Sequence, residues 1–237
     1  MGIVQFKARR EDLRGSRAAL SELALEAGEG VDLLVLPEMA STGYVFPDRD
    51  AVAAVAEPAR GPTWEALSAV ARERRCFVVA GFPERDGARL FNSALVIDRE
   101  GELRSTYRKT LLYDEDLHWA EPGDSGYETF DTGAGRFGVG ICMDLNDDRF
   151  VAWVRDTAPD AIAFPTNWVR DPDGTDAWRY WAWRLDGVRS ALVAADTWGR
   201  EGTTTFEGRS CVLRDRTVLA WLPEEGDGWA RATIPVC

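Results

Sequence analysis

The segment Asp32–Glu38, DLLVLPE, is the stretch on which the predicted fold depends. Its apolar run, Asp32–Leu36, is continuous instead of alternating, which is typical of a strand buried on both faces of a sheet in an α/β protein. Pro37 lacks a backbone N–H group and therefore ends the strand. Glu38 is thus predicted to lie at a strand end, where the side chains of α/β proteins face a crevice.

Strands and helices alternate on both sides of this segment. A strand around Ile3–Phe6 and a helix that ends at Gly28 precede it. A helix that begins near Pro62 and a second continuous apolar strand, Cys76–Phe82, follow it. This rhythm predicts an α/β fold.

The rest of the chain is rich in strand patterns. A hairpin of Leu90–Ile97 and Glu102–Lys109 carries Lys109 at its end, and Cys142 ends a glycine-rich strand, Gly135–Cys142. Ala161–Phe164 and Ala191–Asp196 are typical of central strands, and SCVLRD, RTVLAWL and WARATIPV predict further strands near the C-terminus. Because no linker, low-complexity tract or repeat interrupts the pattern, we predict a single domain over residues 1–237 with a mixed sheet system.

Composition excludes several classes of partner. The chain has 28 Lys and Arg against 40 Asp and Glu residues, a net charge of −12, so phosphate backbones and anionic membranes would repel it. We therefore expect no nucleic-acid partner and no membrane association. No apolar run approaches the roughly 20 residues that span a bilayer, and the N-terminus is no signal peptide, which favours a cytoplasmic protein.

The cysteines and the single histidine limit the chemistry. The four cysteines lie far apart without a C-x-x-C pair, so free thiols are expected and neither a disulfide scaffold nor a zinc site is. His118 is the only histidine, so we predict no metal site, and a Ser-His-Asp or Cys-His catalytic group would have to use this residue.

Glu38, Lys109 and Cys142 carry complementary chemistry at three predicted strand ends. A cysteine is a nucleophile only as thiolate, and a desolvated carboxylate can accept its proton as general base. A nearby lysine, with the backbone N–H of Met143, would stabilise negative charge on the oxygen of the attacked carbon. Singly, each residue has a structural explanation: a buried cysteine, a glutamate that solvates a loop, a lysine on an edge strand.

Three segments together resemble a known family. LLVLPEMASTGYVF around Glu38, STYRKTLLYDED around Lys109 and GVGICMDLNDDRF around Cys142 are similar, in order and spacing, to the signature segments of the nitrilase superfamily of carbon-nitrogen hydrolases. The resemblance implies a four-layer α-β-β-α sandwich and a Glu-Lys-Cys triad. By motif, Glu38 is the general base, Cys142 the nucleophile and Lys109 the stabiliser of the tetrahedral intermediate. It also implies that no cofactor is needed.

The family often has a second glutamate in the loop after the lysine. That loop reads YDEDLHWAEPGD here, and the register is ambiguous. Glu115 has the matching side chain and is the residue we prefer, whereas ungapped counting from Lys109 favours Asp116. One more solvated charge in an acidic run is the structural alternative.

The same resemblance bears on the substrate. Nitrile-cleaving members usually carry Trp-Glu after the cysteine, whereas this chain has Met143-Asp144, which favours amides. ICMDLN, PEMASTGY and YRKTLLY are similar to segments of fungal N-terminal asparagine/glutamine amidases. A small ω-amide, a carbamoyl compound or an N-terminal Asn or Gln is therefore expected as substrate, with ammonia as product. The residues expected to contact the substrate are Met143, Asn167, Trp168 and Tyr44.

An ammonium-bearing substrate would suit a site surrounded by acidic side chains, since opposite charge raises the local substrate concentration. The acidic residues expected there are Asp114, Glu115, Asp116 and Asp144.

Three alternative functions stay open. The chain could be a non-catalytic relative that binds or assembles, a true nitrilase, or a Cys-His-Asp hydrolase that uses His118. Trp178, Trp181 and Leu185 share one face of a predicted helix, which indicates core packing, or a homodimer face of the kind that the resemblance implies.

Overall fold

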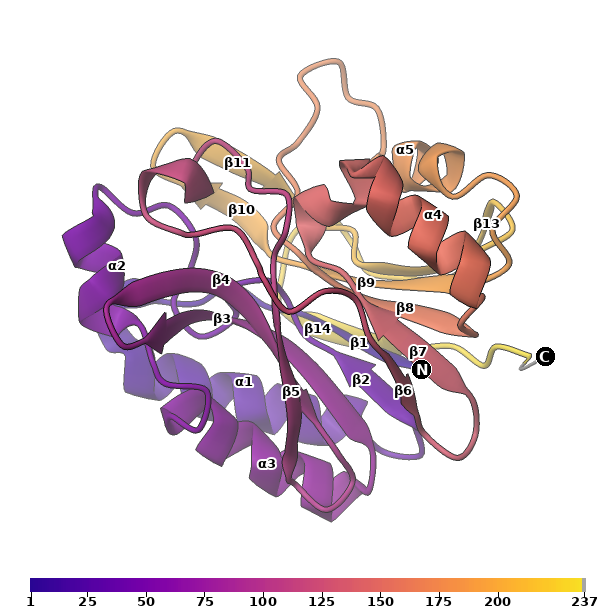
Figure 1. Ribbon diagram of the computed structural model, residues 1–237, viewed down its shortest axis with the longest axis horizontal. Coiled ribbons are helices and arrows are strands. Elements are labelled where there is room, and N and C mark those ends of the chain that lie inside the picture. The colour runs from indigo at the N-terminus through magenta and orange to yellow at the C-terminus, as the bar shows by residue number, and fades with distance from the viewer. Residues whose placement is uncertain (236–237) are drawn as a thin grey trace.

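Two six-stranded mixed sheets lie face to face, and helices cover the outer face of each, which gives the layers α-β-β-α (Figure 1). The computed structural model describes residues 1–235. Val236 and Cys237, on which the end of the last predicted strand and one of the four expected free thiols fall, lie outside the described residues.

The first sheet holds β14 (Gly228–Arg231), β1 (Gly2–Gln5), β2 (Leu33–Val35), β3 (Phe77–Asp86), β4 (Arg89–Ile97) and β5 (Leu103–Arg108), in that order. The second holds β13 (Thr217–Trp221), β12 (Cys211–Arg214), β9 (Ala191–Asp196), β8 (Ala161–Thr166), β7 (Arg136–Val139) and β6 (Thr129–Asp131). A separate hairpin joins β10 (Trp198–Glu201) to β11 (Thr204–Glu207). The helices are α1 (Leu13–Ala27), α2 (Arg49–Val55), α3 (Pro62–Arg74), α4 (Asp148–Thr157) and α5 (Ala177–Arg184), with short 3-10 helices η1 (Arg10–Asp12), η2 (Asp116–His118) and η3 (Cys142–Asn146).

The two sheets share one pattern of strand pairing. Starting from β14 in one sheet and β6 in the other, the pairs are antiparallel, parallel, parallel, antiparallel and antiparallel. β2, β7 and β8 are interior strands with parallel neighbours. The segments that carry Glu38, Cys142 and Asn167 follow the C-terminal ends of these strands. This arrangement brings residues distant in sequence to one region.

The two faces of β2 contact two different hydrophobic cores, which explains why its sequence is continuously apolar. Leu33 and Val35 pack in the core between the two sheets, whereas Leu34 and Leu36 pack in the core under α1 and α3. All four side chains are buried, and each fully buried side chain contributes about 1.5–3 kcal/mol. The prediction of a strand buried on both faces is confirmed.

Local signals explain where the outer helices begin and end. The Asp12 carboxylate accepts a hydrogen bond from Gly15 N at 2.8 Å and caps α1, and Gly28 follows its last residue. Pro62 is the first residue of α3, where its missing N–H costs nothing.

Some elements differ from those the sequence predicts. β7 ends at Val139, not at Cys142, and Cys142 instead begins η3. The helix α4 and the hairpin β10–β11 were not anticipated. The hairpin contains Gly199 within β10 and turns at Gly202, and glycine weakens a strand pattern.

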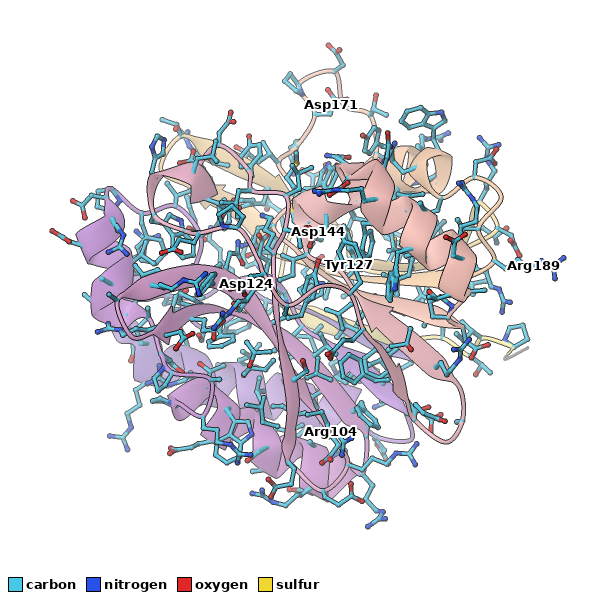
Figure 2. All side chains as sticks on the ribbon, in the orientation of Figure 1. Arg104, Asp124, Tyr127, Asp144, Asp171 and Arg189 are labelled. Atoms are coloured by element: carbon cyan, nitrogen blue, oxygen red, sulfur yellow. The ribbon has the colours of Figure 1, made fainter. Side chains whose placement is uncertain are left out.

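Charged side chains point outward over most of the surface. Figure 2 shows Asp171 and Arg189 at the periphery of this view, whereas Asp144, which is buried, lies toward the middle. No helix within residues 1–235 has the length and apolar character to cross a membrane. In the same range, no group of three or more His, Cys, Asp or Glu side chains is arranged to hold a metal ion.

Candidate active site

The position of Glu38 is set by close contact with strand β3. Gly81 N donates to Pro37 O at 2.9 Å, and Ala40 N donates to Gly81 O at 2.9 Å, so the turn that holds Glu38 is bound to β3 on both sides. A Cβ atom on Gly81 would lie 2.4 Å from the Glu38 Cα atom. Glycine at position 81 therefore permits the approach that places Glu38.

We expect Gly81→Ala to displace the Glu38 turn. Overpacking of this kind destabilises by about 1–3 kcal/mol, and misplacement of a catalytic group by about 1 Å costs roughly 10²-fold in activity. Urea unfolding and amide turnover measure the two effects. Gly228→Ala is the matched control, because a Cβ atom there would make only an ordinary contact at 3.4 Å with Leu222. Equal activity in the two variants would show that Gly81 does not position Glu38.

Lys109 follows β5 and its side chain is completely buried. Its backbone N donates to Asn92 O at 2.9 Å, and its carbonyl accepts from Gly123 N at 2.8 Å. The Lys109 Nζ atom donates to Glu38 Oε1 at 2.7 Å and to Asp116 Oδ2 at 2.6 Å. Two carboxylates thus share one ammonium group.

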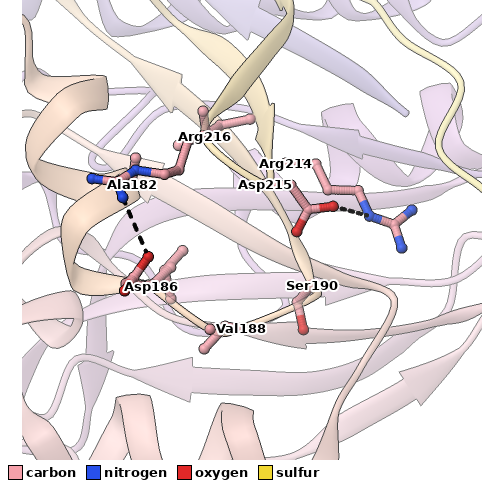
Figure 3. Close-up of a pocket in the computed structure, with 10 residues that line it drawn as sticks. Ala182, Asp186, Val188, Ser190, Arg214, Asp215 and Arg216 are labelled. Atoms are coloured by element: carbon pink, nitrogen blue, oxygen red, sulfur yellow. Dashed lines mark ion pairs between the residues drawn. The ribbon is translucent and has the colours of Figure 1, made fainter.

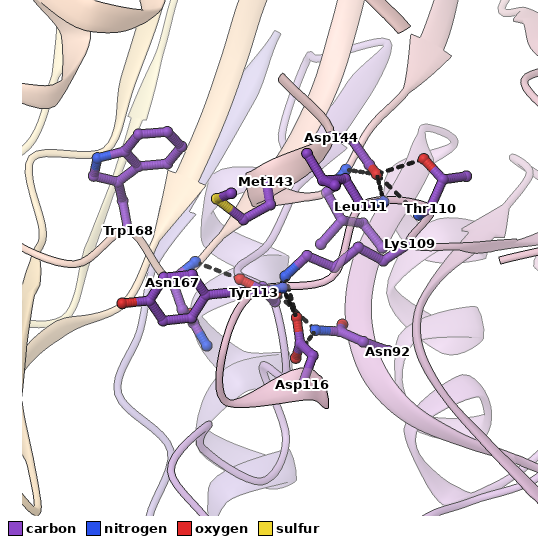
Figure 4. A network of polar contacts seen from close by, with 12 residues as sticks. Asn92, Lys109, Thr110, Leu111, Tyr113, Asp116, Met143, Asp144, Asn167 and Trp168 are labelled. Atoms are coloured by element: carbon purple, nitrogen blue, oxygen red, sulfur yellow. Dashed lines mark hydrogen bonds and ion pairs between the residues drawn. The ribbon is translucent and has the colours of Figure 1, made fainter. Parts of the chain in front are cut away.

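Two amide groups complete this buried network (Figure 4). Asn92 Nδ2 donates to Glu38 Oε1 at 2.7 Å and to Asp116 Oδ1 at 2.9 Å. The backbone N of Asn167 donates to Glu38 Oε2 at 2.8 Å. Asn92 was not assigned a role from the sequence, because a single asparagine in a strand carries no distinctive pattern.

Burial and charge compete at this network. Burial raises the pKa of Glu38, and the positive charge of Lys109 opposes that rise without cancelling it. Burial lowers the pKa of the Lys109 ammonium, but the charges of Asp116 and Glu38 outweigh burial and hold this pKa well above its ordinary value. Lys109 therefore stays positively charged, while Glu38 accepts a proton more readily than an exposed glutamate does.

Cys142 lies on a strained turn within electrostatic range of this network. Its φ angle is 44°, in the left-handed region that non-glycine residues enter at a cost of about 1–3 kcal/mol. Burial raises the pKa of the Cys142 thiol well above its usual value, Glu38 raises it further, and Lys109 lowers it. The Cys142 thiol therefore holds its proton more tightly than an exposed thiol does.

Asp144 joins the turn of Cys142 to the segment of Lys109. Asp144 Oδ1 accepts hydrogen bonds from Thr110 N at 2.9 Å, Thr110 Oγ1 at 2.8 Å and Leu111 N at 2.9 Å. Asp144 Oδ2 accepts from Tyr107 OH at 2.7 Å and Ile141 N at 2.9 Å. The buried Asp144 carboxylate therefore fixes the Cys142 segment relative to the Lys109 segment.

The preference for Glu115 as second acidic residue needs correction. Asp116 is buried and contacts Lys109, whereas Glu115 is half-buried and makes no hydrogen bond or ion pair among the described residues. The reason is the start of η2 at Asp116, which turns this side chain inward. Ungapped counting from Lys109 was the signal that favoured Asp116.

The four acidic residues expected around the site differ in exposure and in their contacts. Asp116 is committed to Lys109 and Asn92, and Asp144 is buried with its hydrogen bonds to two backbone segments. Of the four residues, only Asp114 is exposed, and Glu115 is half-buried.

Three of the residues expected to contact a substrate lie near the Lys109 ammonium group. Figure 4 shows Met143, Trp168 and Asn167 around the ammonium end of Lys109, together with Tyr113, which the sequence analysis did not single out. Trp168 packs on Tyr180 and Trp181.

Asn167 and Tyr44 present buried polar groups to this region. The Asn167 side-chain amide and the Tyr44 hydroxyl have no hydrogen-bond partner within residues 1–235. The Tyr44 ring centroid lies 5.8 Å from Lys109 Nζ.

His118 does not share this environment. It ends η2 and its side chain is exposed, whereas Glu38, Lys109 and Cys142 are all buried. The geometry therefore favours the glutamate over the histidine as the base beside Cys142.

Comparisons with known proteins agree with this fold. A family model described as carbon-nitrogen hydrolase matches residues 2–235. A protein named nitrilase from Pyrococcus abyssi is 34% identical over 203 residues, which cover 83% of this chain and 74% of that protein. A protein N-terminal amidase from Schizosaccharomyces pombe is 27% identical over 229 residues, 79% of this chain and 80% of that protein.

A solved structure is also similar. An amidase from Nesterenkonia sp. AN1, in a variant that shows the Michael addition of acrylamide at its active-site cysteine, has a TM-score of 0.83 at 23% identity and covers 99% of this chain and 92% of that one. This likeness confirms the four-layer sandwich. The family match across the described residues shows that the chain belongs to the carbon-nitrogen hydrolase family of the nitrilase superfamily, whose members are enzymes that hydrolyse carbon–nitrogen bonds other than peptide bonds.

Proposed function

We propose that this protein is an amide hydrolase in which Cys142 forms a thioester intermediate, assisted by Glu38 and Lys109. The observation that carries the proposal is the buried network of Glu38, Lys109 and Asp116 within electrostatic range of the Cys142 thiol. Such a network is costly to bury, and a general base with a raised pKa is the kind of group that catalysis requires.

The first half of the reaction forms the thioester. Glu38 takes the thiol proton as the Cys142 sulfur bonds to the amide carbon, and the amide oxygen becomes negatively charged. Lys109 has one N–H left after its bonds to Glu38 and Asp116, and this N–H with the backbone N–H of Met143 would hold the oxyanion. Glu38 then gives its proton to the nitrogen, the carbon–nitrogen bond breaks and ammonia leaves.

The second half of the reaction releases the acid. Glu38 removes a proton from water as the water oxygen bonds to the thioester carbon. The carbon–sulfur bond then breaks, Glu38 returns the proton to the sulfur, and the carboxylic acid product departs. The residues therefore return to their starting protonation states, and no metal or organic cofactor takes part in these steps.

The substrate class follows from the chain's own residues and its relatives. Met143-Asp144 after the nucleophile favours amides, and one of the relatives is named for action on protein N-termini. We therefore propose a small ω-amide, a carbamoyl compound or an N-terminal Asn or Gln as substrate. The nitrilase name of the Pyrococcus abyssi relative supports nitriles as the second candidate class.

The proposed function is tested by ammonia release from a panel. Small ω-amides, carbamoyl compounds, Asn- and Gln-initiated peptides and aliphatic nitriles are incubated with the protein and with Cys142→Ala. We expect ammonia from at least one amide, and none from the variant. Ammonia release that persists in Cys142→Ala would contradict the mechanism, and release from nitriles alone would select the second class. A folded protein inert on the whole panel would favour the non-catalytic alternative.

The pH dependence of kcat/KM is expected to reflect Glu38. Because burial raises the pKa of Glu38 above its ordinary value of 4.5, activity should fall as the pH drops through a value above 4.5, where the base becomes protonated. Since the pKa of Lys109 lies well above 10.5, no loss of its charge should limit activity at moderately alkaline pH.

Steady-state kinetics across pH, with tryptophan fluorescence as a control for acid unfolding, measures this profile. An activity that stays constant down to pH values below 4.5 would show that Glu38 is not the base.

A further inference from the structure

A cavity of about 730 Å³ opens beside the turn that follows Glu38. Three segments line it: the residues after β1, the loop between Thr42 and Pro47, and the hairpin β10–β11. Its volume lies within the range of about 300–1,000 Å³ that is typical of small-molecule sites. None of its lining residues takes part in the proposed reaction.

The cavity concentrates positive charge in an acidic protein. Lys7, Arg9, Arg10 and Arg200 line it, although the chain carries a net charge of −12. The Lys7 Nζ atom donates to the Arg200 carbonyl at 3.0 Å, and within residues 1–235 no carboxylate forms an ion pair with it. This ammonium group also lies 5.2 Å from the centroid of the Trp198 ring, and since neither contact neutralises its charge, it can still bind an anion.

Three acidic residues line the cavity: Glu11 is exposed and makes no side-chain hydrogen bond or ion pair among the described residues, whereas Asp227 and Glu201 hold backbone groups. Asp227 Oδ1 accepts from Lys7 N at 3.0 Å and from Trp198 Nε1 at 2.7 Å. Glu201 Oε2 accepts from Tyr44 N at 2.9 Å and from Val45 N at 3.0 Å, and its contact with Arg10 is longer, at 3.4 Å. These carboxylates therefore fix the backbone of the cavity and neutralise its cations only in part.

Another cavity of the same molecule provides a contrast. It has a volume of about 210 Å³ and lies at the end of α5 (Figure 3). There Arg216 pairs with Asp186 at 3.5 Å, and Arg214 approaches Asp215 at 3.9 Å. Its cations are matched by neighbouring acids, so that it offers no comparable excess of positive charge.

Tyr44 connects the cationic cavity with the catalytic network. Its backbone N is held by Glu201 at the cavity wall, while its ring lies 5.8 Å from Lys109 Nζ and packs edge-on against Phe206. A ligand that draws Arg10 away from Glu201 leaves the carboxylate that holds Tyr44 N without its counter-ion. The occupancy of the cavity is thereby linked to the position of a ring beside Lys109.

We propose that this cavity is a second, non-catalytic site for a small organic oxyanion, a carboxylate or a phosphate ester, and that its occupancy alters turnover through Tyr44. Lys7 and Arg10 are the anion-binding groups. The binding itself does not depend on the proposed hydrolase function, whereas the effect on turnover rests on it.

Calorimetric titration of Cys142→Ala with succinate, and separately with glycerol phosphate, tests the site, because this variant keeps the cavity without turnover. We expect saturable binding of at least one of the two, and the stronger binder identifies the source of the oxyanion. Lys7→Met and Arg10→Gln should each weaken that binding by about 10-fold or more, which corresponds to about 1.4 kcal/mol. Arg216→Gln, in the smaller cavity, should leave it unchanged.

Two results would overturn the proposal. Absence of saturable binding for both anions, or equal binding in Lys7→Met, Arg10→Gln and the control, would remove the site. The effect of cavity occupancy on turnover has its own test. The bound anion should change kcat in the wild-type protein and not in the Lys7→Met/Arg10→Gln double variant. Binding without any change in kcat would show that the cavity does not affect turnover.

Discussion

Replacing Glu38 with glutamine is expected to lower kcat/KM by about 10²–10⁴-fold, the usual contribution of a general base. Glutamine keeps the size of the side chain and an oxygen that can accept from Lys109 and Asn92, but it cannot take the Cys142 proton. Amide turnover of purified Glu38→Gln measures the loss.

The stability of the same variant depends on two opposing contributions. A carboxyl group whose pKa is raised on folding stabilises the protein only below its unfolded pKa, and this contribution is lost as the pH rises through the folded value. At neutral pH this contribution is absent, and Glu38→Gln also removes a charge that stabilises the buried Lys109 ammonium and places an amide against the Asn167 N–H, so we expect a folded variant with a lower Tm. Near-normal turnover, or turnover that is lost because the variant is unfolded, would contradict the role of Glu38.

Removal of the Asp144 carboxylate is expected to have the largest combined effect on stability and activity. Asp144→Ala leaves five hydrogen-bond donors around the Cys142 and Lys109 segments without their acceptor. Each buried donor left without an acceptor costs about 1–3 kcal/mol, and loosening of the two segments should lower kcat roughly 10²-fold.

Asp144→Asn separates positioning from charge, since it keeps one oxygen acceptor in the same shape. We expect Asn to recover part of both losses relative to Ala, as measured by urea unfolding and kcat. Asp114→Asn is the matched control, because Asp114 is an exposed acid in the loop near the site. If Asp144→Ala were no more harmful than Asp114→Asn, Asp144 would not hold the two segments together.

The sequence predicts those features that depend on local pattern. The apolar run before Pro37 predicts β2, and the position of Glu38 at its end follows from proline geometry. Lys109 is likewise anticipated because a hairpin carries it to a strand end. These predictions need no knowledge of long-range contacts.

The sequence predicts less where side-chain direction depends on tertiary contact. Glu115 and Asp116 are adjacent, so their composition cannot tell which points inward, and the start of η2 decides it. Asn92 and Gly81 act through partners more than 20 residues away along the chain, Glu38 among them. Such couplings leave no local periodicity for a single sequence to reveal.

The identity of the covalent intermediate tests the central proposal most directly. Trypsin should release Cys142 in the peptide Phe137–Arg149, in which it is the only cysteine. After rapid acid quenching of a reacting amide, mass spectrometry of this peptide should show the acyl group on Cys142, with a lower yield in Glu38→Gln. Substrate turnover with no acyl group on this peptide, or with the acyl group on the peptides of Cys76 or Cys211, would contradict the account.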